Sequence, residues 1–392
     1  MTEHYVPTLT EFPWQMPVLD KDLSTPPESP SKGDRYIAGN DWVDLGQLVP
    51  GEMIVWAMEY LENGIVLAGT HQNGHIVRST DYGVNWTDLG QQFSESRIYS
   101  FAYLGSGIVL AGTGHSGKIL RSTDYGENWS DLGQQFSQIW ITSLADLGSG
   151  IVLAGTAEDG KILRSVDYGV NWTDLGQQFS QTHIYSLADL GGGIVLGGAA
   201  PGGEILRSVD YGVNWTSINH KIGGVTHVWS FADLENGIVL AGTRDNGKIL
   251  RSTDYGVNWT DLGQQFSQLD IESLVYLGNG VALAGTGPSG KILRSTDYGE
   301  NWTDLGQQFL QIDIMSFACF ENGVVVAGTN NDAKILRFGS AGDWIGHEQD
   351  IVWYDGSDWQ FVTPQPGWFV WANNENKLYC YRTSWQEYSP GT

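Results

Sequence analysis

The sequence predicts an all-β fold: a seven-bladed β-propeller over residues 40–339, inserted between the two halves of a small β domain formed by residues 1–39 and 340–392. Three observations support this prediction. An eight-residue string recurs six times at nearly constant spacing, each repeat contains four short β-type segments, and no helix-length apolar periodicity interrupts them. Together they argue against a helical or mixed α/β class.

The recurring string is Ser-(Thr/Val)-Asp-Tyr-Gly-(Val/Glu)-Asn-Trp. Its copies begin at residues 79, 122, 165, 208, 252 and 295, so they are 43 residues apart except for one step of 44. In the second repeat the strands are predicted at residues 98–104, 108–112, 118–122 and 128–133. Four short strands in a repeat of this length are typical of one propeller blade.

The seventh repeat is incomplete, because its predicted strands at 314–320, 324–328 and 334–338 lack an outer partner. That partner is present upstream. Residues 41–46, Asp-Trp-Val-Asp-Leu-Gly, match the Asn-Trp-Thr-Asp-Leu-Gly segment of the complete repeats. We therefore expect the N-terminal strand to complete the last blade, which removes an exposed sheet edge.

The recurring string resembles the Asp box of sialidases, sortilin-type receptors and related propellers, and the resemblance covers residues 79–302. It implies a structural role: the carboxylate caps backbone N–H groups of a tight turn, Gly adopts a positive φ, and Trp anchors the turn between sheets. The expected Asp-box residues are Asp81, Asp124, Asp167, Asp210, Asp254, Asp297, Trp86, Trp129, Trp172, Trp215, Trp259 and Trp302.

The flanking segments differ in composition from the repeats. Residues 26–37 are Pro-Pro-Glu-Ser-Pro-Ser-Lys-Gly-Asp-Arg-Tyr-Ile, and residues 344–347 are Trp-Ile-Gly-His. They resemble two nearly adjacent stretches of a small domain of unknown function found in tail-fibre and tail-associated proteins of bacteriophages, prophages and gene transfer agents. The resemblance implies a virion component that docks to other tail proteins or to sister subunits as a homo-oligomer. The aromatic residues of 350–388 suit a core, a subunit interface or a sugar-binding surface.

Charge and composition narrow the classes of partner. The formal net charge of -25 disfavours nucleic acids and anionic membranes, since both require clustered Lys and Arg. The first residues form no signal peptide, so we expect synthesis in a cytoplasm without export. Cys319 and Cys380 fall in different predicted domains, which excludes a disulfide framework. The histidines show no metal-ligand spacing, and we expect neither a metal nor another cofactor.

One face of the predicted propeller varies between repeats. The turns that contain the Asp boxes hardly change, whereas two alternating positions at the start of each inner strand do. The side chains there suit a sugar, because aromatic faces stack on C–H surfaces and polar groups hold hydroxyls. The predicted glycan-binding residues are Trp56, Arg97, Tyr99, Trp140, His183, Tyr185, His227, Trp229, Asp270, Glu272 and Asp313.

Alternatives to glycan binding remain open. Asp270, Glu272 and Asp313 could serve a glycosidase, bind Ca²⁺ or be solvated, and the variation itself could be drift. The propeller could also be a spacer in the virion. Sialidase chemistry is disfavoured, since arginines occupy one equivalent position in all seven repeats: Arg78, Arg121, Arg164, Arg207, Arg251, Arg294 and Arg337. We expect a protein that is not an enzyme.

Overall fold

The computed structural model describes residues 42–338 apart from 135–136, 138–139, 219–224, 308 and 321–322, together with the backbone of seven strands in the flanks. The described residues form strands and turns without a helix. The chain divides into two compact units: Met1–Val43 with Glu321–Val324 and Phe338–Thr392, and Asp44–Phe320 with Val325–Arg337. The predicted boundaries at 39/40 and 339/340 lie within a few residues of this division.

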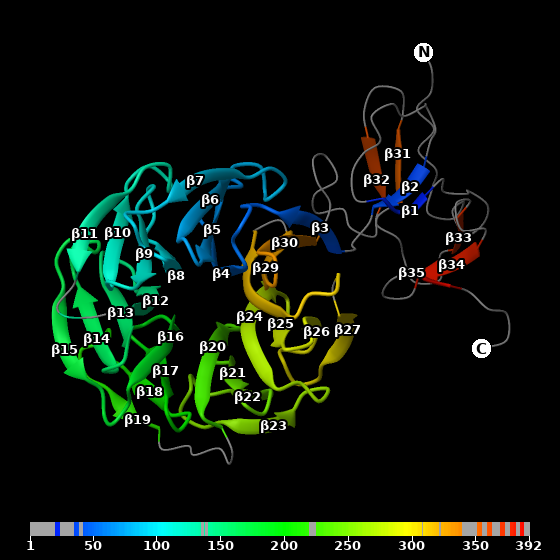
Figure 1. Ribbon diagram of the computed structural model, residues 1–392. Coiled ribbons are helices and arrows are strands. Elements are labelled where there is room, and N and C mark those ends of the chain that lie inside the picture. Colours follow the sequence, from blue (N-terminus) through cyan, green and yellow to red (C-terminus); the bar gives the residue numbers. More distant parts are fainter. Residues whose placement is uncertain are drawn as a thin grey trace. The chain divides into compact units, whose positions relative to one another are not determined.

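The larger unit is a ring of antiparallel strand groups around a central axis (Figure 1). Its innermost strands are β4 (Ile54–Tyr60), β8 (Arg97–Tyr103), β12 (Trp140–Asp146), β16 (His183–Asp189), β20 (His227–Asp233), β24 (Asp270–Gly278) and β28 (Asp313–Cys319). Each pairs with a second strand: β5 (Val66–His71), β9 (Val109–Gly114), β13 (Val152–Ala157), β17 (Val195–Ala200), β21 (Val239–Arg244), β25 (Val281–Gly287) or β29 (Val325–Asn330).

The outer half of each group contains two more strands. The third strands are β6 (His75–Ser79), β10 (Lys118–Ser122), β14 (Lys161–Ser165), β18 (Ile205–Ser208), β22 (Lys248–Ser252), β26 (Lys291–Ser295) and β30 (Lys334–Phe338). The outer strands are β7 (Thr87–Gln91), β11 (Ser130–Gln134), β15 (Thr173–Gln177), β19 (Thr216–Ser217), β23 (Thr260–Gln264), β27 (Thr303–Gln307) and β3 (Trp42–Gln47). We call each group a blade.

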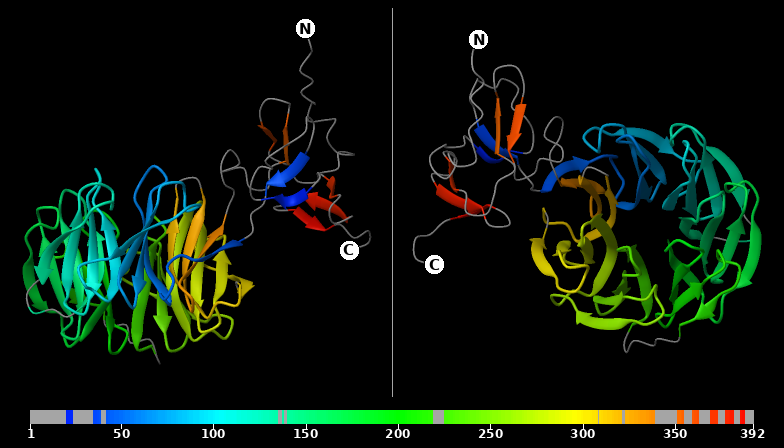
Figure 2. Two further views of the ribbon diagram at one scale, coloured as in Figure 1. Left: turned by 45° about the horizontal axis from the view of Figure 1, so that its top comes forward. Right: turned by 180° about the vertical axis from the view of Figure 1, so that it is seen from behind.

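The N-terminal strand β3 lies beside β30 and takes the outer position of the last blade (Figures 1 and 2). Lys334 Nζ donates to Asp44 Oδ2 at 2.8 Å across the two strands. The ring is closed a second time by Arg337, whose Nε donates to the carbonyl oxygen of Tyr82 at 3.0 Å. The predicted closure by the N-terminal strand is therefore present.

Predicted strand bounds differ from the observed ones by one or two residues. In the second blade the inner strand begins at Arg97 rather than at 98, because the backbone pairing with Gly114 does not depend on an apolar side chain. The outer strand begins at Ser130 rather than at 128. Asn128 belongs to the preceding turn, where its backbone N–H and side chain both donate to Asp124.

The six recurring strings form identical turns, which we call repeat turns. In the third, Asp167 Oδ1 accepts from the backbone N–H of Asn171 at 2.8 Å and from Ser165 Oγ, while Oδ2 accepts from Asn171 Nδ2. Gly169 has a φ of 78°, and its carbonyl accepts from Trp172 Nε1 at 2.9 Å. In this turn the Asp carboxylate accepts backbone N–H donors, Gly has a positive φ, and the Trp indole bonds to the Gly carbonyl. Tyr168 also has a positive φ, of 59°, which the sequence did not indicate.

The core lies between adjacent blades. The first cluster packs Leu67 and Ile76 of one blade against Ile98 and Leu120 of the next, all fully buried. The blades approach so closely that a Cβ on Gly155 would lie 2.8 Å from Ile184 of the next blade, and it would also meet Ser143 Oγ of its own blade. Six repeated arginines fasten neighbouring blades through Nε–H bonds to a tyrosine carbonyl: Arg78, Arg121, Arg164, Arg207, Arg251 and Arg337. Their structural interpretation is confirmed.

The smaller unit contains strands from both ends of the chain. The strand β1 (Asp20–Leu23) pairs in parallel with β2 (Arg35–Ala38), which pairs antiparallel with β31 (Ile351–Tyr354). This sheet ends with β32 (Trp359–Val362), and a second sheet comprises β33 (Phe369–Ala372), β34 (Lys377–Tyr381) and β35 (Trp385–Glu387). The motif at 344–347 and the aromatic side chains of this unit lie outside the described residues.

Candidate functional site

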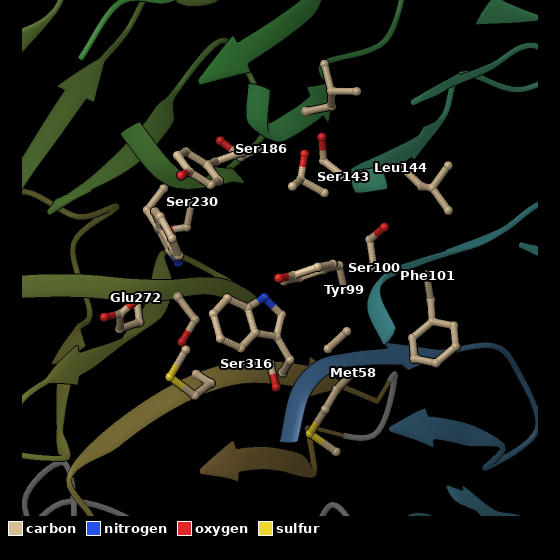
Figure 3. A pocket seen from close by; sticks show the side chains of 18 of the residues that line it. Met58, Tyr99, Ser100, Phe101, Ser143, Leu144, Ser186, Ser230, Glu272 and Ser316 are labelled. Carbon is tan, nitrogen blue, oxygen red and sulfur yellow. The ribbon is translucent and has the colours of Figure 1, made fainter. Parts of the chain in front are cut away.

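A cavity of about 420 Å³ lies at the centre of the ring (Figure 3). All seven inner strands contribute to it, through Trp56, Tyr99, Thr142, Tyr185, Trp229, Glu272 and Met315. Each of these residues sits at a β-bulge. For example, Ile98 pairs with Thr113 and Ser100 with Gly112, so Tyr99 has no partner of its own. Because a bulge re-aims a side chain, the same irregularity in every blade turns one residue toward the axis.

Five aromatic side chains from five consecutive blades line the cavity, and we call them the aromatic arc; all five are partly exposed. The ring centroids of Tyr185 and Trp229 are 4.4 Å apart, those of Trp56 and Tyr99 are 5.3 Å apart, and those of Tyr99 and Trp140 are 6.0 Å apart. Trp56 and Trp229 approach to 6.4 Å. These ring pairs are T-shaped or tilted rather than parallel. This geometry suits packing of the rings on one another and stacking of a flat ligand on them.

Two arginines lie over the aromatic arc. Arg97 Cζ is 5.5 Å from the ring centroid of Trp140, and its Nη1 donates to the hydroxyl of Tyr99 at 2.8 Å. Arg244, from the end of β21, places Cζ 4.8 Å from the ring centroid of Trp229. Both distances are within the range of a cation–π interaction.

Carboxyl groups occupy the opposite arc, on β24 and β28. A Cβ on Gly287 would lie 2.5 Å from Asp313 Oδ1 and 3.2 Å from Glu272 Oε1, so both side chains converge on this glycine. Asp270 Oδ2 lies 3.8 Å from Arg244 Nε, and Asp270 Oδ1 accepts a hydrogen bond from the backbone N–H of Asp245. Burial raises the pKa of Glu272 to about 8, against the opposing field of Arg244. Burial also raises the pKa of Asp313.

The structure separates the predicted binding residues into two sets. Those that line the cavity are Trp56, Tyr99, Trp140, Tyr185, Trp229 and Glu272. The other predicted residues lie beside the cavity, in contact with its lining residues or close to them: Arg97, His183, His227, Asp270 and Asp313. The His183 ring stacks on Tyr185 at 5.0 Å, and burial together with nearby His227 lowers the pKa of His183. The segment 220–224, at the 44-residue step, lies outside the described residues.

Comparison between repeats missed a second layer of the cavity. Six serines follow the bulged residues and line the cavity, namely Ser100, Ser143, Ser186, Ser230, Ser273 and Ser316 (Figure 3). The apolar residues that come next in each strand, such as Phe101 and Leu144, also line it. Ser273 Oγ donates to the carbonyl of Ile314 in the next blade at 3.1 Å, whereas Ser100 Oγ and Ser230 Oγ are buried without a partner. These serines hardly vary, so divergence between repeats could not identify them. The predicted binding residues did not include Arg244, which ends β21.

Residues 42–338, with the gaps given above, contain no group of three or more His, Cys, Asp or Glu side chains arranged to hold a metal ion. In the same residues no helix is long and apolar enough to cross a membrane. Cys319 has a free thiol, and burial raises its pKa to about 11.

Solved structures with the same arrangement include YCF48 bound to a D1 peptide, at 17% identity and a TM-score of 0.63 over 77% of this chain and 97% of that one. The fold is a β-propeller. A streptogramin B lyase matches this propeller at 10% identity and a TM-score of 0.67, over 76% of this chain and 97% of the lyase. The GH74 xyloglucanase from Xanthomonas campestris matches at 16% identity and a TM-score of 0.60, over 83% of this chain and 55% of the xyloglucanase.

These neighbours include enzymes and proteins that are not enzymes, so the propeller fold does not decide whether this chain is catalytic. Residues 330–386 match a family model described as a protein of unknown function, DUF2793. The match begins in β29, before the predicted domain boundary at 340, and continues to β35. A search of curated proteins finds no match for the chain.

Proposed function

We propose that the propeller binds a cell-surface carbohydrate through the central cavity, and that the chain is a receptor-binding component of a viral or virus-derived tail or surface fibre. One observation carries the first part: five partly exposed aromatic side chains from five different blades surround a single cavity of about 420 Å³. Aromatic surfaces with a few polar groups at fixed positions suit the alternating apolar and hydroxyl faces of a sugar.

The virion part of the proposal rests on the flanking sequence motifs. The chain ends that contain them supply paired strands to one sheet, since Arg35 pairs with Trp353 and Ile37 with Ile351. A domain completed by both chain ends suits a module that attaches an inserted binding domain to other tail proteins or to sister subunits. A fusion of residues 1–39 with 340–392 should then fold and assemble without the propeller, as measured by circular dichroism and light scattering. Failure of that fusion to fold would contradict an autonomous docking module.

Binding is tested with the purified full chain on an array of bacterial surface glycans and on whole host cells. We expect retention of a subset of glycans and loss of that retention in the Trp229→Ala variant. If that variant binds cells normally while Trp359→Ala or Trp371→Ala does not, the smaller unit is the adhesin and the propeller is a spacer.

A glycosidase is the second candidate function, favoured by the raised pKa values of Glu272 and Asp313. A protonated carboxyl group beside a second carboxyl group is the combination that glycoside hydrolysis requires. We propose binding without catalysis, so incubation with host polysaccharide should release no new reducing ends. Release that disappears in Asp270→Asn, Glu272→Gln or Asp313→Asn would establish the glycosidase instead.

A further inference from the structure

Asp270, Glu272 and Asp313 lie together at the cavity, and we call them the acidic arc. One of their carboxyl oxygens has no hydrogen-bond partner. Glu272 is only 6% exposed, it lines the cavity, and its Oε2 makes no hydrogen bond. A buried polar atom is normally satisfied by a donor from the protein or from a ligand. When Glu272 is ionised, this oxygen accepts hydrogen bonds and attracts positive charge. A ligand group that donates and is cationic would therefore satisfy the oxygen and stabilise the ionised form.

The charges around Glu272 favour the same kind of ligand. Asp270 and Asp313 act on Glu272 with fields of the same sign, while Arg244 opposes them. Asp313 receives a hydrogen bond from the neutral amide of Asn330. The arc therefore groups three carboxyl groups around one opposing guanidinium.

Arg244 is loosely held in this position. Its side chain is 42% exposed, its contact with Asp270 is a 3.8 Å ion pair, and its remaining described contact is the face of Trp229. Arg97, by contrast, is anchored by its hydrogen bond to the Tyr99 hydroxyl. Arg244 thus places a replaceable cation between an aromatic face and an acidic arc. The combination of a ring face and carboxylates is the arrangement that recognises ammonium groups.

We propose that the ligand of this cavity is a saccharide with a free, protonated amino group, and that its ammonium takes the place of the Arg244 guanidinium between Trp229 and the carboxyl groups of Asp270, Glu272 and Asp313. This inference rests on the proposed carbohydrate binding and specifies its substrate class. Arg244 is then an internal competitor of the ligand, and the aromatic arc contacts the apolar faces of the sugar rings.

The test compares a glucosamine tetramer with the matching N-acetylglucosamine tetramer, using isothermal titration calorimetry on the full chain. The free amine should bind at least about tenfold more tightly. Glu272→Gln should reduce this preference, whereas Arg244→Gln should strengthen binding of the amine and so enlarge the preference for the amine over the acetylated tetramer. Glu127→Gln, the same substitution at an exposed repeat turn, is the matched control for non-specific charge and should change neither affinity.

Equal affinity for the two tetramers would overturn the inference, as would binding of neither. The inference would also be overturned if Glu127→Gln reduced the preference for the amine as much as Glu272→Gln does. General surface charge would then explain the result. Weaker amine binding by Arg244→Gln would contradict displacement of that residue. The proposed function fails separately: it is wrong if Trp229→Ala leaves glycan-array and cell binding intact, whatever the charge of the glycan.

Discussion

The indole rings of Trp56 and Trp229 approach to 6.4 Å between centroids, although they belong to the inner strands of two blades that are not neighbours in the ring. Tyr99 contacts the first of these rings and Tyr185 the second. The contacts within the aromatic arc therefore depend on closure of the whole ring of blades. The residues of this arc can be substituted separately from the residues of the core.

Replacing Trp229 by Ala should weaken glycan binding while the protein stays folded. The expected loss is about 1–3 kcal/mol, the range for removal of one stacking aromatic. Trp259→Ala is the control, since this indole is 6% exposed, packs in a core cluster and donates to the carbonyl of Gly256. It should lower the free energy of unfolding by about 3–5 kcal/mol. Equal stability losses in the two variants, measured by denaturant unfolding, would contradict this division of roles.

Asp167→Asn should destabilise the third repeat turn by about 1 kcal/mol, because a hydrogen-bonded carboxylate at the turn is replaced by a neutral amide. Hydrogen bonds from the backbone and side chain of Asn171 lower the pKa of Asp167. Its contribution to stability is therefore present above the ordinary Asp pKa and is lost as the pH falls through the lower, folded-state value. Unfolding curves at pH 7 and at pH 3 measure the effect. The difference between the two proteins should be smaller at pH 3 than at pH 7, and a constant difference would argue against the carboxylate.

Glu272→Gln should stabilise the protein at high pH. Burial raises the pKa of Glu272 to about 8, so the folded protein loses stability as the pH rises from the ordinary Glu value through about 8. A folded-state pKa one unit higher corresponds to about 1.4 kcal/mol, and we expect the advantage of the variant at pH 9 to exceed that amount. Near pH 4 the two proteins should unfold with similar free energies. An advantage of the same size at both pH values would exclude titration of this residue as the cause.

Gly155→Ala should destabilise the protein by about 1–3 kcal/mol. The added Cβ would meet Ser143 Oγ of the same blade and Ile184 of the next blade. Gly197 precedes the equivalent glycine of the next repeat, and a Cβ there would have only ordinary contacts at 3.5 Å or more. Gly197→Ala restores the residue found in the other repeats and should be neutral or stabilising by up to about 1 kcal/mol. Thermal unfolding of both variants measures the contrast. A larger loss for Gly197→Ala would mean that the blade approach does not determine this position.

The number and order of the strands could be predicted from the sequence, because the pattern of short segments and repeat turns is local and recurs along the chain. Closure by β3 could also be predicted, since residues 41–46 match the outer strands of other repeats. Six of the cavity-lining residues were found through their divergence between repeats. Five of these side chains share one place because the same β-bulge occurs in every inner strand, which no single strand pattern reveals. The sixth, Trp140, begins β12 and pairs with Ala157.

Only the tertiary structure determined how these residues meet. Divergence cannot identify Ser273 or its sister serines, because they hardly vary between the repeats. Nor could the sequence place Arg244, the last residue of β21, over Trp229, or bring Glu272 and Asp313 together at Gly287. The repeat itself is encoded by short-range hydrogen bonds and turns, which a sequence displays directly. Distances across the ring depend on closure and on the side chains that fill it, so they exist only once all blades are packed.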